Sequence, residues 1–197
     1  LKPGSTILEL NAGTGIDALR LAQAGHHVLA TDAAPGMVLQ LQQKALEPSP
    51  AGRLTALACP YENLNQLPDG KYDHVFSNFG GLNCCPDLGL VIRQLPRLIK
   101  PGTRITWVIM PRLCPWEWLW LFRGSWSGFR RLSNGGVKAH LEGEYFMTYY
   151  YSLPQLQRQF GPAYKLLKVE GLGAVSPPPA SYTFVRRFPQ MTQWLNT

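Results

Sequence analysis

The 197-residue sequence contains no run of 18 or more apolar residues, and it therefore predicts no membrane-spanning helix. Its four cysteines form neither a C-x-x-C pair nor a set with zinc-ligand spacing, so we predict no metal site. Internal repeats, low-complexity tracts and a recognisable secretory signal are also missing. Reduced thiols in a cytoplasmic protein are the expectation that fits these absences.

Charged residues make up only 16% of the chain, whereas 45% of the residues are hydrophobic. This composition predicts a packed α/β domain rather than a disordered chain. The net charge is +7, but the basic residues are scattered, with short clusters only at Arg130-Arg131 and Arg186-Arg187. An ordinary basic surface explains this pattern better than a nucleic-acid interface, so a nucleic-acid partner is not expected.

Segments of strand and helix character alternate through the first 110 residues. The predicted strands are Thr6–Leu10, His27–Thr31, Leu54–Ala58, Tyr72–Ser77 and Arg104–Met110, and the predicted helices are Gly15–Ala24, Met37–Leu46 and Leu88–Ile99. Such alternation predicts a Rossmann-like, doubly wound and mostly parallel sheet with helices on both faces. Ligands of such sheets bind beyond the carboxyl ends of the strands.

The alternation stops after Met110, where Pro111–Tyr151 is rich in tryptophan, tyrosine and phenylalanine. We predict an aromatic-rich helical insertion, residues 111–163, that acts as a substrate lid or forms a helical cap with its own small core. An amphipathic surface for a membrane or a partner is a third interpretation. The pattern also predicts a helix from Ser152 to Phe160, a sixth strand at Lys165–Glu170 and a final helix at Phe184–Leu195.

No convincing seventh strand follows, and the chain starts at Leu1 shortly before a strand. We therefore expect a single domain, residues 1–197, that is truncated at one or both termini.

The most informative stretch runs from Ile7 to Gly15, where a strand enters a glycine-containing loop and a helix follows at once. Gly13 and Gly15 allow a ligand to approach the backbone, and the helix N-terminus presents free N–H groups. The spacing of these glycines also fits the dinucleotide fingerprint, so an NAD-dependent oxidoreductase is a rival prediction. Glu9 argues against it, because a carboxylate at the strand end suits a cationic ligand rather than an anionic pyrophosphate.

These segments resemble the ordered motifs of class I S-adenosylmethionine-dependent methyltransferases. Glu9–Gly15 resembles the first motif, Asp32–Met37 the second, Tyr72–Asn78 the fourth strand, and Lys100–Met110 the turn and fifth strand. The resemblance spans about Leu1–Met110 in unbroken order. It implies S-adenosylmethionine as the cofactor and methyl transfer by in-line displacement.

The resemblance also implies a set of cofactor-binding residues. They are Glu9, Asn11, Ala12, Gly13 and Gly15 on the first loop; Asp32, Ala33 and Met37 for the ribose; Pro60, Tyr61 and Glu62 beside adenine; and Asn78, Phe79 and Gly80 beneath the methionine portion. Asp32 is also placed to cap the following helix, and both roles can hold at once. Asn11 departs from the family pattern because it replaces a glycine, although asparagine tolerates a left-handed backbone.

The segments Ser77–Cys84 and Cys114–Trp118 resemble a group of bacterial small-molecule methyltransferases of undefined substrate. We predict a small, apolar or aromatic substrate, contacted by Asn83, Trp116, Trp118, His140, Tyr145 and Tyr149, and we assign no catalytic residue.

Alternatives to this function are a nucleic-acid or protein methyltransferase and a cofactor-binding module without activity. A nucleic-acid methyltransferase is disfavoured because Ser77-Asn78-Phe79-Gly80 stands where base-amine methyltransferases carry Asn/Asp-Pro-Pro-aromatic. The oligomeric state is not predicted.

Overall fold

The computed structural model describes residues 1–47, 52–70, 72–115, 127–141, 143–172 and 186. The chain divides into two compact units, Leu1–Met110 and Pro111–Thr197, and each is described by itself. Among the described helices, none combines the length and the apolar character that crossing a bilayer requires.

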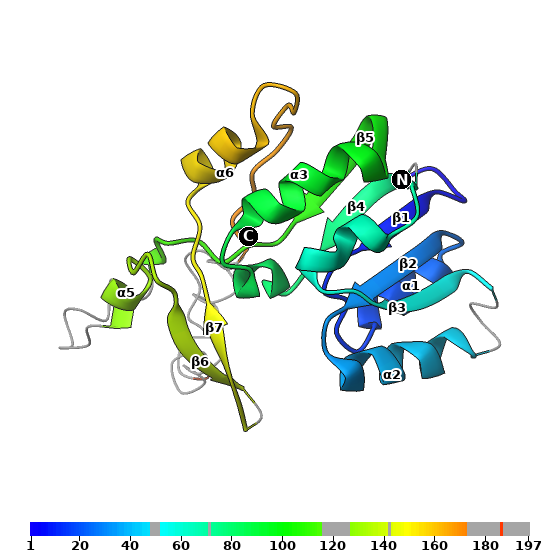
Figure 1. The fold of residues 1–197 in the computed structure, drawn as a ribbon, viewed down its shortest axis with the longest axis horizontal. Coiled ribbons are helices and arrows are strands. Elements are labelled where there is room, and N and C mark those ends of the chain that lie inside the picture. The colour runs from blue at the N-terminus through cyan, green and yellow to red at the C-terminus, as the bar shows by residue number, and fades with distance from the viewer. Residues whose placement is uncertain (48–51, 71, 116–126, 142, 173–185, 187–197) are drawn as a thin grey trace. The chain divides into compact units, whose positions relative to one another are not determined.

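The first unit is built on a five-stranded parallel sheet (Figure 1). Its strands are β1 (Thr6–Glu9), β2 (His27–Asp32), β3 (Leu54–Ala58), β4 (Tyr72–Ser77) and β5 (Ile99–Trp107), in the order β3-β2-β1-β4-β5. The strand order reverses between β1 and β4, so the switch point lies where these two strands end. This architecture confirms the predicted Rossmann-like, doubly wound sheet.

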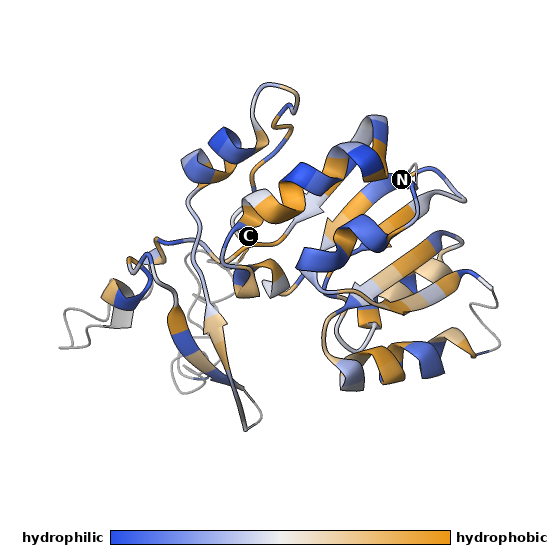
Figure 2. Cartoon of the chain, in the orientation of Figure 1, coloured by the Kyte–Doolittle hydropathy of each residue, from blue (hydrophilic) through white to orange (hydrophobic). Residues whose placement is uncertain are grey.

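Helices α1 (Ile16–Gln23) and α2 (Pro35–Ala45) cover one face of this sheet. Ala18 and Ala22 of α1 and Leu41 of α2 pack in one cluster with Ile7 and Val28 of the strands. Figure 2 shows that hydrophobic residues concentrate on the strands of the sheet. The small alanine side chains of α1 allow the helix to lie close to the sheet, and this fixes the position of the loop that precedes it.

Helix α3 (Leu88–Leu98) is strongly amphipathic and buries Leu88, Val91, Leu95 and Leu98. Its N-cap residue Asp87 accepts a hydrogen bond from the amide of Gly89 at 2.8 Å. The helix contacts β5 and the 3-10 helix η1 (Tyr61–Gln66). A second 3-10 helix, η2 (Gly81–Cys84), joins the end of β4 to the segment before α3.

β5 contains the predicted turn at Lys100-Pro101-Gly102 as a bulge. Tyr72 pairs with Ile99 and His74 pairs with Arg104, so the pairing register shifts across this segment. Gly102 has a positive φ of 87° there. The strand therefore begins at Ile99, five residues before its predicted start, and ends at Trp107 rather than Met110.

The second unit contains the short helix α5 (Ser127–Arg130), an antiparallel hairpin of β6 (Val137–Leu141) and β7 (Glu144–Thr148), and helix α6 (Leu153–Phe160). The predicted helix after Ser152 is confirmed, and the hydroxyl of Ser152 accepts from the amide of Gln155. The hairpin was not predicted within the helical insertion.

Two predictions for the C-terminal part have different outcomes. The predicted strand at Lys165–Glu170 is wrong, because these residues form neither a helix nor a strand. A β-strand requires a ladder partner as well as a suitable sequence. The predicted helix at Phe184–Leu195 lies outside the described residues except for Arg186. The single-domain organisation and the lid at residues 111–163 stay predictions.

Candidate functional site

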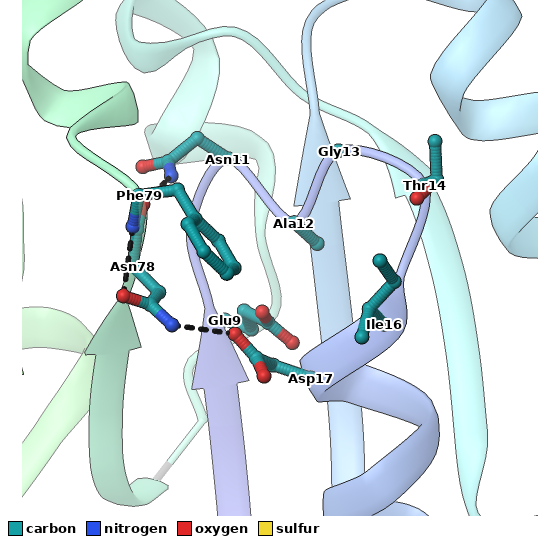
Figure 3. A pocket seen from close by; sticks show the side chains of 9 residues that line it. All are labelled: Glu9, Asn11, Ala12, Gly13, Thr14, Ile16, Asp17, Asn78 and Phe79. Atoms are coloured by element: carbon teal, nitrogen blue, oxygen red, sulfur yellow. Dashed lines mark hydrogen bonds between the residues drawn. The ribbon is translucent and has the colours of Figure 1, made fainter. Parts of the chain in front are cut away.

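A hollow opens at the switch point, where the loop after β1 faces the loop after β4 (Figure 3). It encloses about 410 Å³, part of which is open solvent. Nine residues line it: Glu9, Asn11, Ala12, Gly13, Thr14, Ile16, Asp17, Asn78 and Phe79. Six of them are predicted cofactor-binding residues. The structure therefore brings the loop of the first motif and the residues after β4 together in one pocket.

The loop between β1 and α1 reaches its shape through three residues with positive φ. Asn11 has φ 50°, Gly13 has φ 56° and Gly15 has φ 79°. A β-carbon on Gly15 would lie 2.3 Å from a methyl carbon of Leu41, whereas a β-carbon on Gly13 would meet nothing within 4 Å. Gly15 is therefore required by packing as well as by its backbone, and Gly13 by its backbone alone.

Asn11 occupies the left-handed region as predicted, and its side chain ties three elements together. Its Oδ1 accepts from the hydroxyls of Tyr61 at 3.0 Å and Ser77 at 2.7 Å. Its Nδ2 donates to the carbonyl of Asn78 at 3.2 Å. Gly81 packs so closely against it that a β-carbon there would lie 2.2 Å from Nδ2. The amide that replaces the family's glycine thus holds the pocket walls together.

Replacing Asn11 with glycine is expected to lower the free energy of unfolding by about 1–2 kcal/mol. Glycine accepts the positive φ but leaves the hydroxyls of Tyr61 and Ser77 without their acceptor. Urea denaturation measures the loss. Asn11→Ala is the matched comparison and should lose about 1 kcal/mol more, because alanine pays for the left-handed backbone. Equal losses in the two variants would reject the backbone role.

Glu9 is the last residue of β1 and is only 2% exposed. Among the described residues, its Oε2 has no hydrogen-bond partner. Burial raises the pKa of Glu9 to about 8, and the negative charge of Asp17 adds to this rise. A buried carboxyl group with an unused acceptor, placed beside a pocket, is suited to a positively charged ligand.

Asp17 lies in the first turn of α1 and faces the same pocket as Glu9. Its Oδ2 accepts from Nδ2 of Asn78 at 2.7 Å. This hydrogen bond joins the start of α1 to the loop after β4. Asp17, Thr14 and Ile16 were not predicted from the sequence. An acidic residue in the first turn of a helix is common for electrostatic reasons, so the pattern gave no signal for a site.

Asp32 ends β2 and holds two backbone amides. Its Oδ2 accepts from the amide of Gly13 at 2.8 Å, and its Oδ1 accepts from the amide of Ala34 at 2.9 Å. The N-cap of α2 is Ala34, so Asp32 forms a turn before the helix rather than the predicted cap. Each carboxylate oxygen keeps a further lone pair, so the predicted ribose contact remains available.

Phe79 has a positive φ of 53° and is 82% exposed at the mouth of the pocket (Figure 3). A bulky side chain seldom adopts this backbone, and such strain is concentrated at functional sites. Gly80 continues the left-handed bend with φ 69°. A β-carbon on Gly80 would lie 3.3 Å from atoms of Asn83 and Met110, which fixes the course of this loop.

The predicted adenine residues follow β3 at the same edge of the sheet, since the amide of Cys59 donates to the carbonyl of Asp32. Tyr61 is bonded to Asn11, whereas Pro60 and Glu62 do not line the pocket. Ala33 and Met37 also lie outside its lining. Gly15, Asp32 and Gly80 are not among the lining residues either. Contacts of all the predicted residues with a cofactor stay predictions.

The predicted substrate residues are divided between the two units, so their assembly into one site stays a prediction. Asn83 is fully buried, and its amide pairs with both the N–H and the carbonyl of Met110, so it holds two loops of the first unit together. His140 stacks on Tyr145 across the hairpin of the second unit. Tyr149 belongs to the second unit as well, and Trp116 and Trp118 lie outside the described residues.

Residues 7–102 match a protein family described as a methyltransferase domain. The curated relatives include demethylmenaquinone methyltransferases of Corynebacterium glutamicum (strain R), 31% identical over 108 residues, and Clavibacter sepedonicus, 37% identical over 105 residues. These alignments cover 54% and 52% of this chain. The chain spans about two fifths of the length of these relatives, namely 42% and 40%.

Solved structures show the same fold. A SAM-dependent methyltransferase from Methanosarcina mazei has a TM-score of 0.60 and 22% identity over 79% of this chain and 77% of that chain. The protein DhpI, in its complex with SAM and HEP, has a TM-score of 0.55 and 19% identity over 78% of this chain and 67% of that chain.

Proposed function

We propose that this chain is a class I S-adenosylmethionine-dependent methyltransferase, and that it transfers a methyl group from this cofactor to a small apolar or aromatic molecule. The match of residues 7–102 to a methyltransferase domain supports the first part. The proposal depends most on one observation. The pocket at the switch point combines a buried carboxyl group at Glu9 with a backbone loop that is open to a ligand at Gly13.

The residues of the pocket fit the chemistry of S-adenosylmethionine. Its amino group and its sulfonium are both positive, and the free Oε2 of Glu9 provides the acceptor that an ammonium group needs. Gly15 caps α1 without a side chain, so amide groups of the first turn are left for a carboxylate. Asp32 keeps lone pairs for ribose hydroxyls. An anionic pyrophosphate would be repelled by the negative charge of Asp17.

S-adenosylmethionine supplies a methyl group on a positively charged sulfur, which leaves as a neutral thioether. The part of this chain is to hold the reacting atoms in line at about 3–3.5 Å, which provides most of the acceleration of a displacement. Asn78 and Phe79 stand beside Glu9 in the pocket and bound the space in which the acceptor would meet the methyl group. We assign no general base.

Two observations support a small apolar or aromatic acceptor. Pro111–Tyr151 follows the fifth strand, where substrate-binding segments of such sheets are placed, and it is rich in aromatic residues. The curated relatives are named for demethylmenaquinone. A lid formed by residues 111–163 belongs to this proposal. The four cysteines are free thiols, which supports a cytoplasmic location.

Isothermal calorimetry with S-adenosylmethionine, S-adenosylhomocysteine and NAD tests the cofactor. We expect the first two to bind and NAD not to bind. Transfer of a radiolabelled methyl group to demethylmenaquinone and simpler hydroxylated aromatic compounds then tests the acceptor. Binding of NAD without binding of S-adenosylmethionine would overturn the proposal, whereas cofactor binding without transfer to any aromatic compound would overturn only the acceptor class.

A further inference from the structure

The surroundings of Glu9 offer its carboxyl group no compensating cation among the described residues. Its neighbours across the sheet are Ala30 on β2 and Phe76 on β4, which are apolar. The side chain is 2% exposed, and Oε2 has no described partner. Glu9 also lines the pocket at the switch point. Within the part of the chain that the structure describes, nothing stabilises a charge at this position, which leaves that role to a ligand that enters the pocket.

The charged and titratable groups on the neighbouring elements do not change this balance. Asp17 of α1 adds a second negative charge on the pocket side. Asp32 of β2 is held by the amides of Gly13 and Ala34. Lys44 of α2 donates to the carbonyl of Thr14. His74 of β4 pairs with Ile7, two residues before Glu9 on β1. The nine described residues that line the pocket thus include two carboxyl groups and no cationic side chain.

We propose that Glu9 and Asp17 form one cation site, in which a proton held by Glu9 in the free protein is exchanged for the ammonium group of S-adenosylmethionine. This inference rests on the proposed function, and it adds Asp17 and a proton to the binding reaction. The free acceptor at Oε2 favours the ammonium over the sulfonium, because only the ammonium can donate a hydrogen bond.

The exchange follows from the cost of ionising two neighbouring carboxyl groups in a partly buried space. Asp17 is less buried than Glu9 and accepts from Asn78. Glu9 keeps a proton, which agrees with the rise of its pKa to about 8. An entering ammonium supplies the missing positive charge, so Glu9 ionises. The proton on Glu9 leaves to solvent, N–H groups of the ammonium donate to the carboxylate, and no covalent bond changes.

The raised pKa of Glu9 also determines how the free energy of unfolding depends on pH. The folded pKa of Glu9 lies above the unfolded value of 4.5, so the folded protein binds more protons between pH 4.5 and about 8. Its contribution to stability is fully present below pH 4.5 and is lost as the pH rises through about 8. The affinity for the cofactor changes in the opposite direction and should rise about tenfold per pH unit near pH 6–7, because one proton is released.

Calorimetry of the whole chain at about pH 7, in buffers with different ionisation enthalpies, measures the proton release. We expect nearly one proton per bound S-adenosylmethionine. S-adenosylhomocysteine keeps the ammonium but has no sulfonium, so it should release the same number. Release with S-adenosylmethionine alone would overturn the assignment to the ammonium.

Three variants complete the test. Glu9→Gln should bind with no proton release and with an affinity that no longer depends on pH in this range. Asp17→Asn keeps an acceptor for Asn78 but removes the charge that adds to the effect of burial on the pKa of Glu9. The pKa of Glu9 should therefore fall but stay above its usual value, and the variant should release fewer protons at the same pH. Glu47→Gln removes an exposed carboxylate after α2 and outside the pocket, and it should behave as the wild type.

The outcomes separate this inference from the proposed function. Cofactor binding without proton release in the wild type overturns the exchange and leaves the methyltransferase proposal intact. Unchanged proton release in Asp17→Asn overturns the shared site. If neither S-adenosylmethionine nor S-adenosylhomocysteine binds at any pH, the proposed function and this inference fail together.

Discussion

Replacing Gly15 with alanine is expected to lower the free energy of unfolding by about 2–5 kcal/mol. About 1–2 kcal/mol comes from placing a β-carbon at a φ of 79°. The rest comes from overpacking, because the new carbon would lie 2.3 Å from Cδ2 of Leu41. Leu41 is fully buried within the cluster between α1, α2 and the sheet, so it cannot move aside freely. Urea denaturation followed by tryptophan fluorescence measures the loss.

Two controls isolate the contact with Leu41. Gly13→Ala has the same backbone problem at φ 56° but no atom within 4 Å of its β-carbon, and it should lose only about 1–2 kcal/mol. In a Leu41→Ala background, the change at Gly15 should also cost only about 1–2 kcal/mol, because the δ-methyl groups are gone. Equal losses for the two glycine variants would show that packing against α2 is not the reason for Gly15.

Replacing Asp32 with alanine is expected to weaken binding of S-adenosylmethionine by about 1.5–3 kcal/mol, or about 10- to 150-fold. Two effects act together. The ribose hydroxyls lose a charged acceptor, and the amides of Gly13 and Ala34 lose the oxygens that now hold them. The loop after β1 is therefore less ordered in the free protein and loses more conformational entropy when a ligand binds. Calorimetry gives the dissociation constant.

Asp32→Asn separates these effects. Its Oδ1 can still accept from Ala34, but its Nδ2 cannot accept from Gly13. The affinity of this variant is therefore expected to lie between those of the wild type and the alanine variant. An unchanged dissociation constant in Asp32→Ala would remove this residue from the cofactor site. A large loss of stability with normal affinity would assign Asp32 to the loop alone.

Much of the first unit could be predicted because local patterns and tertiary structure agree there. α3 shows a clear helical period, and it begins at the predicted Leu88 after an N-cap aspartate. Glu9 was predicted as an acid inside the end of a strand, and the structure places it there. In contrast, the hydrogen bonds of Asn11 to Tyr61 and Ser77 depend on residues about 50 and 66 positions away. No local pattern contains such information.

The second unit shows where patterns failed. The hairpin turns at Gly143, which has φ 91°, but Glu-Gly is a weaker turn signal than Asn-Gly or Asp-Gly. Tyr145, Phe146 and Met147 follow one another without alternation, so β7 lacked the period of a half-buried strand. Lys165–Glu170 has strand-like composition and forms no strand. Strand propensity is fulfilled only where a neighbouring strand accepts the backbone hydrogen bonds.

The position of β5 in the sheet has a consequence for self-association. No other described strand pairs with its outer side, so a nine-residue strand presents one row of backbone donors and acceptors. Such an edge invites addition of an extended segment from another molecule. Lys100 and Arg104 are exposed on this strand, and Pro101 lacks an amide proton. Lys100 is paired with Asp73. Repulsion between the Arg104 side chains of two copies and the interrupted ladder should disfavour edge-to-edge aggregation.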